Sequence, residues 1–127
     1  MPSRSHSMTA DLVGGAGVAA ATVTERIPGP CYFLGLACKY TSQPVTTDVT
    51  LVCVDPTGLE KTLFTRSNSN VDVPMHQIME VLRAPDGTPV AQPNVGPPLI
   101  SGHLRLNVAG GDAVAAGVRL AVILSFR

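Results

Sequence analysis

The chain has 127 residues, 45% of them hydrophobic, and its nine basic and nine acidic side chains cancel. A chain of this length encloses one hydrophobic core and can fold without a metal or a disulfide. Because a protein that binds nucleic acid through its phosphates needs surplus Lys and Arg, the balanced charge argues against nucleic acid as a direct partner.

Turn-forming residues are abundant, with 12 Gly and 11 Pro, and they favour an all-β domain over a helical bundle. No segment approaches the ~18 apolar residues of a transmembrane helix, and no signal-like apolar core follows the polar start. We therefore expect a soluble protein, made in the cytoplasm of its host, with no membrane partner.

The three cysteines cannot all pair with one another inside the chain. Cys31 and Cys38 are seven residues apart, so on one strand they would face opposite ways and should not bond each other. We expect these two thiols and that of Cys53 to be free and buried, as is usual in a reducing compartment.

Residues 1–17 are too small and polar to build a core, and they predict an N-terminal arm attached to a domain at residues 18–127. We predict that the arm lies along a neighbouring subunit, with Leu12 and Val13 as its apolar anchors. Glycines at three positions would then let the backbone run close to that surface: Gly14, Gly15 and Gly17. The alternative is that the arm covers an edge of its own sandwich. With the arm on a neighbour, a chain lacking residues 1–17 should still fold but should bind its partner weakly.

Strand signals begin after the arm. The run Val18–Ile27 predicts a first strand, and the compact apolar run Cys31–Tyr40 predicts a buried strand in which Gly35 indicates a bulge or a close backbone contact. The β-branched run Asp48–Val54 predicts another strand, joined by the type I turn sequence Asp-Pro-Thr-Gly to a paired strand.

The middle of the chain is ambiguous. In residues 71–83, the apolar spacing of Met75, Ile78, Met79 and Leu82 is that of a short helix, although the neighbouring sequence is all strand. Residues 84–98 hold repeated Pro and Gly and should be irregular.

The last quarter of the chain alternates apolar and polar residues in two runs, which predict a hairpin folded over the glycines at 110 and 111. Together the runs predict an antiparallel β-sandwich or jelly-roll-like fold of six to eight strands with an extended N-terminal arm. Its inner face should take ten side chains: Val49, Leu51, Cys53, Leu104, Leu106, Val108, Val118, Leu120, Val122 and Leu124.

Motifs that would identify a chemistry are weak. Gly15-x-Gly17-x-x-Ala20 matches the loose dinucleotide fingerprint, but that motif works only between a strand and a helix of a βαβ unit. The cysteines with His76 and His103 lack the tight ligand pairs of a structural zinc site. We therefore predict no catalytic residues, no metal and no cofactor.

The order DVTLVCVDPTG, VDVPM, APDGT, PLISGHLRLNVAGGD and LAVILSFR resembles small β-sandwich proteins of tailed-bacteriophage head modules, many of them capsid decoration (cement) proteins. The resemblance covers roughly residues 30–127. It implies a structural, non-enzymatic protein on the capsid surface of a virion. Such a protein would bind the major capsid protein, associate with copies of itself and stabilise the head. It also favours an extended path for residues 75–82.

Two other functions stay open. A receptor- or carbohydrate-binding module on the virion surface would need a cleft with exposed aromatic rings, whereas the few aromatic residues of this chain mostly sit in core-like runs. A small enzyme of unknown chemistry would need a pocket in which His, Asp and Ser side chains converge.

Overall fold

The computed structural model describes residues 3–89 and 94–126, and within them the chain forms strands and no helix. The strands are β1 (Ser3–Ala10), β2 (Ala19–Arg26), β3 (Cys31–Tyr40), β4 (Asp48–Val54), β5 (Glu60–Arg66), β6 (Val73–Gln77), β7 (Glu80–Val81), β8 (Val95–Gly96), β9 (Leu99–Ile100), β10 (His103–Gly111) and β11 (Val118–Phe126). The all-β expectation is therefore confirmed.

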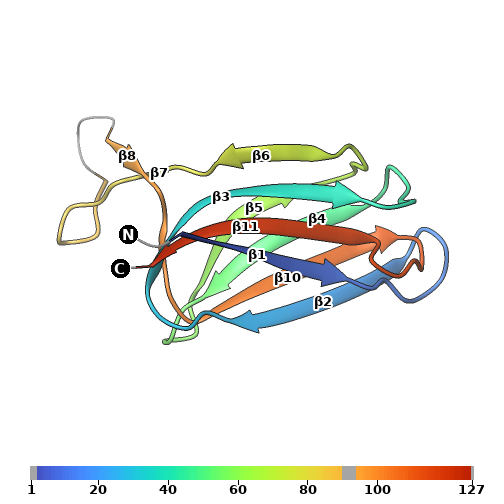
Figure 1. Cartoon of the computed structure of the whole chain (residues 1–127), viewed down its shortest axis with the longest axis horizontal. Coiled ribbons are helices and arrows are strands. Elements are labelled where there is room, and N and C mark those ends of the chain that lie inside the picture. The colour runs from blue at the N-terminus through green and yellow to red at the C-terminus, as the bar shows by residue number, and fades with distance from the viewer. Residues whose placement is uncertain (1–2, 90–93, 127) are drawn as a thin grey trace.

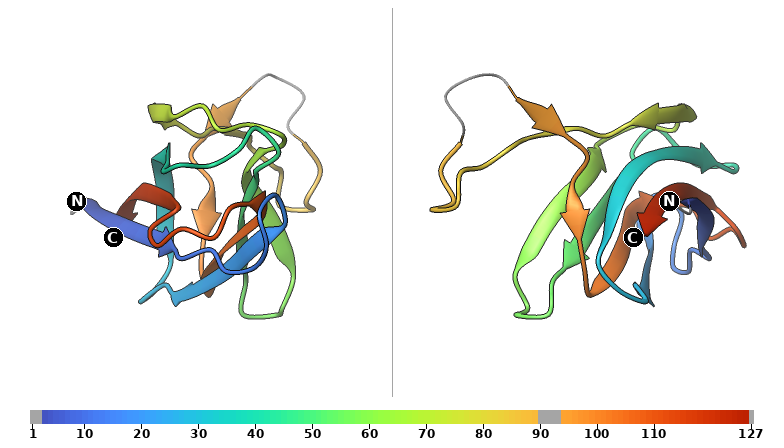
Figure 2. Two further views of the ribbon diagram at one scale, coloured as in Figure 1. Left: turned by 90° about the vertical axis from the view of Figure 1, so that its right-hand side faces the viewer. Right: turned by 60° about the vertical axis from the view of Figure 1, so that its left-hand side comes forward.

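Two antiparallel sheets pack face to face (Figures 1 and 2). One has the order β1-β11-β3-β6, with the short β9 also on β3, and the other has the order β2-β10-β4-β5. Strands that follow one another in the chain repeatedly lie in opposite sheets, as β1 and β2, β3 and β4, and β10 and β11 do. This interleaving of eight strands is the double-sheet arrangement of a jelly roll.

The space between the sheets is filled by the side chains that the two-residue alternation predicts. All ten residues expected on the inner face are buried, and Leu120 and Leu106 are fully enclosed. The prediction of this core is confirmed, because each strand turns every second side chain toward the opposite sheet.

The predicted C-terminal hairpin is wrong. β10 pairs with β2 and β4 in one sheet, whereas β11 pairs with β1 and β3 in the other, so the two strands face each other across the core. Alternation identifies the buried face of a strand but not its hydrogen-bonded neighbour. The glycines taken as a hairpin turn lie at the end of β10, where its pairing with β2 shifts register.

The other predicted strands are present. β3 and β4 have the predicted bounds, and a turn in which the Gly58 amide donates to the Asp55 carbonyl (2.9 Å) joins β4 to β5. Between residues 73 and 81 the chain is extended, as the resemblance predicted and against the helical spacing.

The N-terminal segment lies on its own domain. β1 pairs with β11 along its whole length, from Ser3 opposite Ser125 to Ala10 opposite Val118, and buries Met8. Residues 3–10 therefore do not take the predicted path along a neighbouring subunit but cover an edge of their own sandwich, which was the alternative. The reason is that β11 offers a free edge, and that Met8, Ala10 and Leu12 alternate as a strand requires.

Candidate functional site

Residues expected to anchor the chain on a neighbour lie in and around the β1–β2 connection. Leu12 is buried in the chain's own core, so it is not available as an intermolecular anchor. Val13 is 72% exposed, and its backbone is bonded to that of Ala20 in both directions (3.2 and 3.0 Å). Val13 therefore keeps an apolar side chain in solvent, whereas Leu12 does not.

The three glycines of this set form the turn itself. Gly14 and Gly17 have φ values of +128° and +76°, which side chains rarely adopt. The Gly15 carbonyl accepts a hydrogen bond from Val18 (3.2 Å), and the Gly17 amide donates to Asp112 Oδ1 (2.9 Å). The glycines thus bend the chain from one sheet to the other and tie it to the β10–β11 loop; no helix follows them to receive a dinucleotide.

The thiols and imidazoles are dispersed. Cys31, Cys38 and Cys53 are free and buried, as expected, and burial raises the pKa of each thiol. His76 lies on β6 and His103 on β10, in different sheets. Within the part of the chain that the structure describes, no group of three or more His, Cys, Asp and Glu side chains could hold a metal ion.

The five aromatic side chains are buried or partly buried, which leaves little ring surface for stacking against a sugar. Phe33, Tyr40 and Phe64 are buried, and Tyr32 and Phe126 are partly buried. A carbohydrate-binding face is normally built from rings that lie open to solvent, so a stacking platform of that kind is not formed by these five residues.

The most conspicuous surface feature was not found from the sequence. Between β6 and β9, the chain leaves the sandwich as a projecting ribbon, which we define as residues 78–89 and 94–96 (Figures 1 and 2). Most of the large apolar side chains that are exposed in the described residues lie on this ribbon or immediately beside it: Met75, Met79, Val81, Leu82, Val95 and Leu99.

The ribbon is built from a minimal ladder. Glu80 and Val81 of β7 pair with Gly96 and Val95 of β8, and the Leu82 amide donates to the Asn94 carbonyl (2.9 Å). A two-stranded ladder of this size has little stability of its own in water. Its apolar side chains nevertheless remain 46–53% exposed at Met79, Val81, Leu82 and Val95.

One further contact links the ribbon to the sandwich, and another lies within it. Lys61 Nζ on β5 lies 3.1 Å from Glu80 Oε1, which ties the start of the ribbon to the sandwich. Leu82 lies over Gly96, close enough that a β-carbon at Gly96 would come within 3.2 Å of its Cδ2. Of the four apolar side chains whose spacing suggested a helix, Met75, Met79 and Leu82 are exposed on an extended segment, whereas Ile78 packs against the core.

In residues 3–89 and 94–126, no helix has the length and apolarity needed to cross a membrane. Comparison of the chain with protein-family models, with curated proteins and with solved structures gives no match.

Proposed function

We propose that this protein is a structural component of a bacteriophage particle that decorates the capsid and stabilises the head. The observation that carries the proposal is the exposed apolar ribbon, because a surface of this kind marks a site of protein–protein contact. The jelly-roll strand order supports it, since capsid proteins are among the domains built this way. The choice of a bacteriophage head as the particle rests on the resemblance of the sequence to head-module proteins.

On this proposal the ribbon docks on the major capsid protein, and adjacent copies of the chain contact one another on the lattice. Met79, Val81 and Leu82 would enter the interface as its apolar centre. Burying half-exposed side chains of this size contributes about 25 cal/mol for each Å² removed from water.

The charges of the ribbon are already engaged within the chain. Glu80 pairs with Lys61, Arg83 Nη1 donates to the Gly87 carbonyl (2.9 Å), and Asp86 Oδ1 accepts from the Thr88 amide (3.0 Å). Together these four side chains carry no net charge, so the docking should depend mainly on apolar contact and its affinity should change little with salt.

The direct test is the copy number of the protein in purified heads of the virus that carries its gene. Gel densitometry should give a number that follows the symmetry of the capsid lattice, on the order of hundreds of copies per head. Absence from the particle would overturn the proposal. A handful of copies would also overturn it, in favour of a receptor-binding module.

A second test asks whether the ribbon is the docking surface. Heads stripped of the protein are mixed with the double variant Met79→Asp/Leu82→Asp, and its affinity should fall at least about tenfold, because charge is placed in an apolar interface. The control is Val18→Asp/Val45→Asp, whose side chains are even more exposed (72% and 64%) but lie off the ribbon. Equal binding of both double variants would show that the ribbon is not the contact.

A further inference from the structure

A cavity of about 300 Å³ opens between β1 and β2, at the end where β1 begins and β2 ends. These two strands are the edges of opposite sheets and do not pair with each other, so the sandwich stays open between them. The walls are mainly apolar: Ile27, Leu104 and Leu124 belong to the core, and Pro28 and Phe126 complete the lining. Polar side chains of the two edge strands form the rim: Arg4, Ser5, His6, Glu25 and Arg26.

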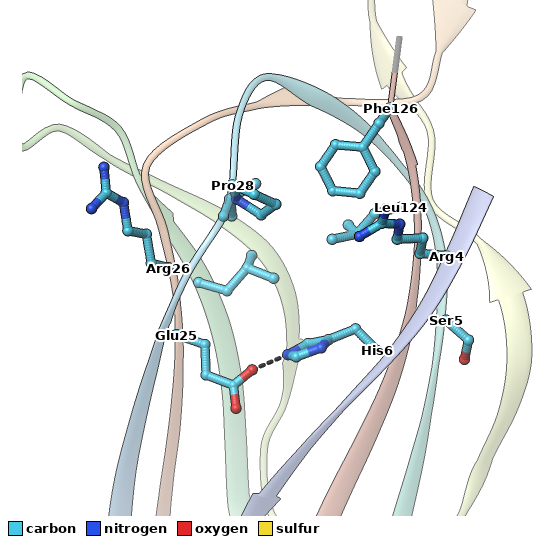
Figure 3. A pocket seen from close by; sticks show the side chains of 10 residues that line it. Arg4, Ser5, His6, Glu25, Arg26, Pro28, Leu124 and Phe126 are labelled. Carbon is cyan, nitrogen blue, oxygen red and sulfur yellow. Dashed lines mark hydrogen bonds and ion pairs between the residues drawn. The ribbon is translucent and has the colours of Figure 1, made fainter. Parts of the chain in front are cut away.

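One pair of side chains spans the opening. The His6 ring from β1 and the Glu25 carboxylate from β2 point toward each other and are hydrogen-bonded through His6 Nε2 (Figure 3). Among the described residues, Glu25 is the one carboxylate that lines the cavity, and this bond already engages it.

Arg4 is placed differently. Its guanidinium carbon lies 5.7 Å from the centre of the Phe126 ring, beside Leu124, and it forms no ion pair among the described residues. Arg26 is also without an ion pair there, but its side chain points away from the cavity (Figure 3). The mouth thus presents a guanidinium beside an apolar wall, and no ion pair within the described residues engages it.

We propose that this cavity binds a small carboxylate with an aliphatic tail. The carboxylate would accept hydrogen bonds from the Arg4 guanidinium, whose planar fork matches its geometry. The tail would lie against Leu104, Leu124 and Ile27. The volume is at the lower end of the range of about 300–1,000 Å³ for small-molecule sites, so a tail of medium length fits and a long one does not. This inference does not rest on the proposed function.

Octanoate is the probe, and octyltrimethylammonium and 1-octanol are its controls of equal tail length. In a ¹H–¹⁵N NMR titration of the full chain, octanoate should shift the amides of residues 4–6, 25–27 and Phe126. It should bind at least about tenfold more tightly than the ammonium compound, with octanol between them, because only the carboxylate gains the charge-assisted hydrogen bonds. Equal binding of octanoate and the ammonium compound would overturn the proposal. Shifts confined to another surface, or no octanoate binding at millimolar concentration, would do the same.

Substitutions at Arg4 separate charge from packing. Arg4→Met keeps an unbranched stem beside Phe126 and should lower octanoate affinity to that of octanol, whereas Arg4→Lys should retain part of it. Arg119→Met removes an exposed arginine that does not line the cavity, and it should leave binding unchanged. If Arg4→Met binds octanoate as tightly as the unmodified chain, with an unchanged melting temperature, the assignment of Arg4 fails.

Discussion

Gln43 and Asp112, from loops at the same end of the sandwich, are joined by two hydrogen bonds. The Asp112 amide donates to Gln43 Oε1 (2.9 Å), and Gln43 Nε2 donates to the Asp112 carbonyl (3.2 Å). Gln43 is only 7% exposed, and its Nε2 also reaches the Thr41 carbonyl (3.0 Å). The Gln43 side chain thus bonds the backbone N–H and C=O of Asp112 as a neighbouring strand would, and it holds the β3–β4 loop against the β10–β11 loop.

Replacing that side chain with an apolar one of similar length should be costly. Gln43→Met leaves the Asp112 amide and two carbonyls without their partner, so we expect a loss of about 2–3 kcal/mol in the free energy of unfolding, measured with urea. Gln77→Met, on an exposed residue of β6, should change it by less than about 0.5 kcal/mol. A Gln43→Met protein as stable as the unmodified chain would show that the loops are held by other contacts.

A substitution at Leu120 tests the predicted hydrophobic core. It is fully buried at the centre of β11, so Leu120→Ala should lower the free energy of unfolding by about 2–5 kcal/mol through lost burial and the cavity left behind. Leu59→Ala makes the same change at a side chain that is 70% exposed and should have almost no effect. Similar effects at the two positions would contradict the placement of β11 inside the sandwich.

The buried thiols predict a dependence of stability on pH. Burial raises the pKa of Cys31 and Cys38 from 9.0 to about 11. Both thiols stay protonated in the folded chain between these values, whereas the unfolded chain releases its protons. The contribution of the two thiols to the free energy of unfolding should therefore be complete below pH 9. It should be lost as the pH rises from 9 through 11.

Urea titrations across this range would measure the effect. The double variant Cys31→Ala/Cys38→Ala should lose less stability over this pH range, because it lacks the two thiols and only other groups of the chain still release protons there. An identical pH profile for the two proteins would refute the assignment. At pH 8 the native thiols should also resist a disulfide reagent that labels them in urea, since the thiolate is the reactive form.

Gly35 controls the attachment of β6, the strand that leads into the projecting ribbon. A β-carbon at this position would lie 2.5 Å from the His76 carbonyl oxygen, closer than such atoms approach. Gly35→Ala should therefore push β6 away from β3 and speed amide hydrogen exchange in residues 73–77. Gly29→Ala is the matched control, because a β-carbon there meets nothing within 4 Å. Equal protection of β6 in both variants would show that the backbone adjusts without loss.

Removing residues 1–17 is now expected to damage the fold. The deletion takes β1 from its sheet and Met8, Ala10 and Leu12 from the core, so the free energy of unfolding should fall by at least about 4 kcal/mol. Ser5→Ala and Thr9→Ala, exposed on the same strand, should be nearly neutral. A truncated chain with an unchanged urea midpoint would show that β1 adds little to the sandwich.

The sequence predicted the strands and their buried faces because both follow from local chemistry. The alternation through Leu104 and Leu106 and through Leu120 and Val122 identifies what each strand hides. It does not identify partners: a paired hairpin and two strands facing each other across a core produce the same pattern. The assignment of β10 and β11 to different sheets depends on β2, β3 and β4, which are far away in sequence.

The surface features were harder to predict for a related reason. Met79 and Leu82 have the spacing of a helical core face, and only the position of the ribbon outside the sandwich shows that they are exposed. Leu12 was predicted to anchor the chain on a neighbour because it stands among small residues. The same small residues let the chain turn, and the turn places the Leu12 side chain in the core of its own domain. Arg4 and Phe126 come from opposite ends of the described chain, and no local pattern connects them.

The pairing of β1 with β11 sets an order of events during synthesis. The ribosome delivers the first strand of this sheet long before the last, and at about 5–20 residues per second the delay lasts several seconds. Throughout that time Met8 and Ala10 have no sheet to join, because both β1 and β3 pair with β11. The Ser, Arg and His residues of Ser3–Ser7 keep the waiting strand well hydrated, which protects the nascent chain from joining the edge of another.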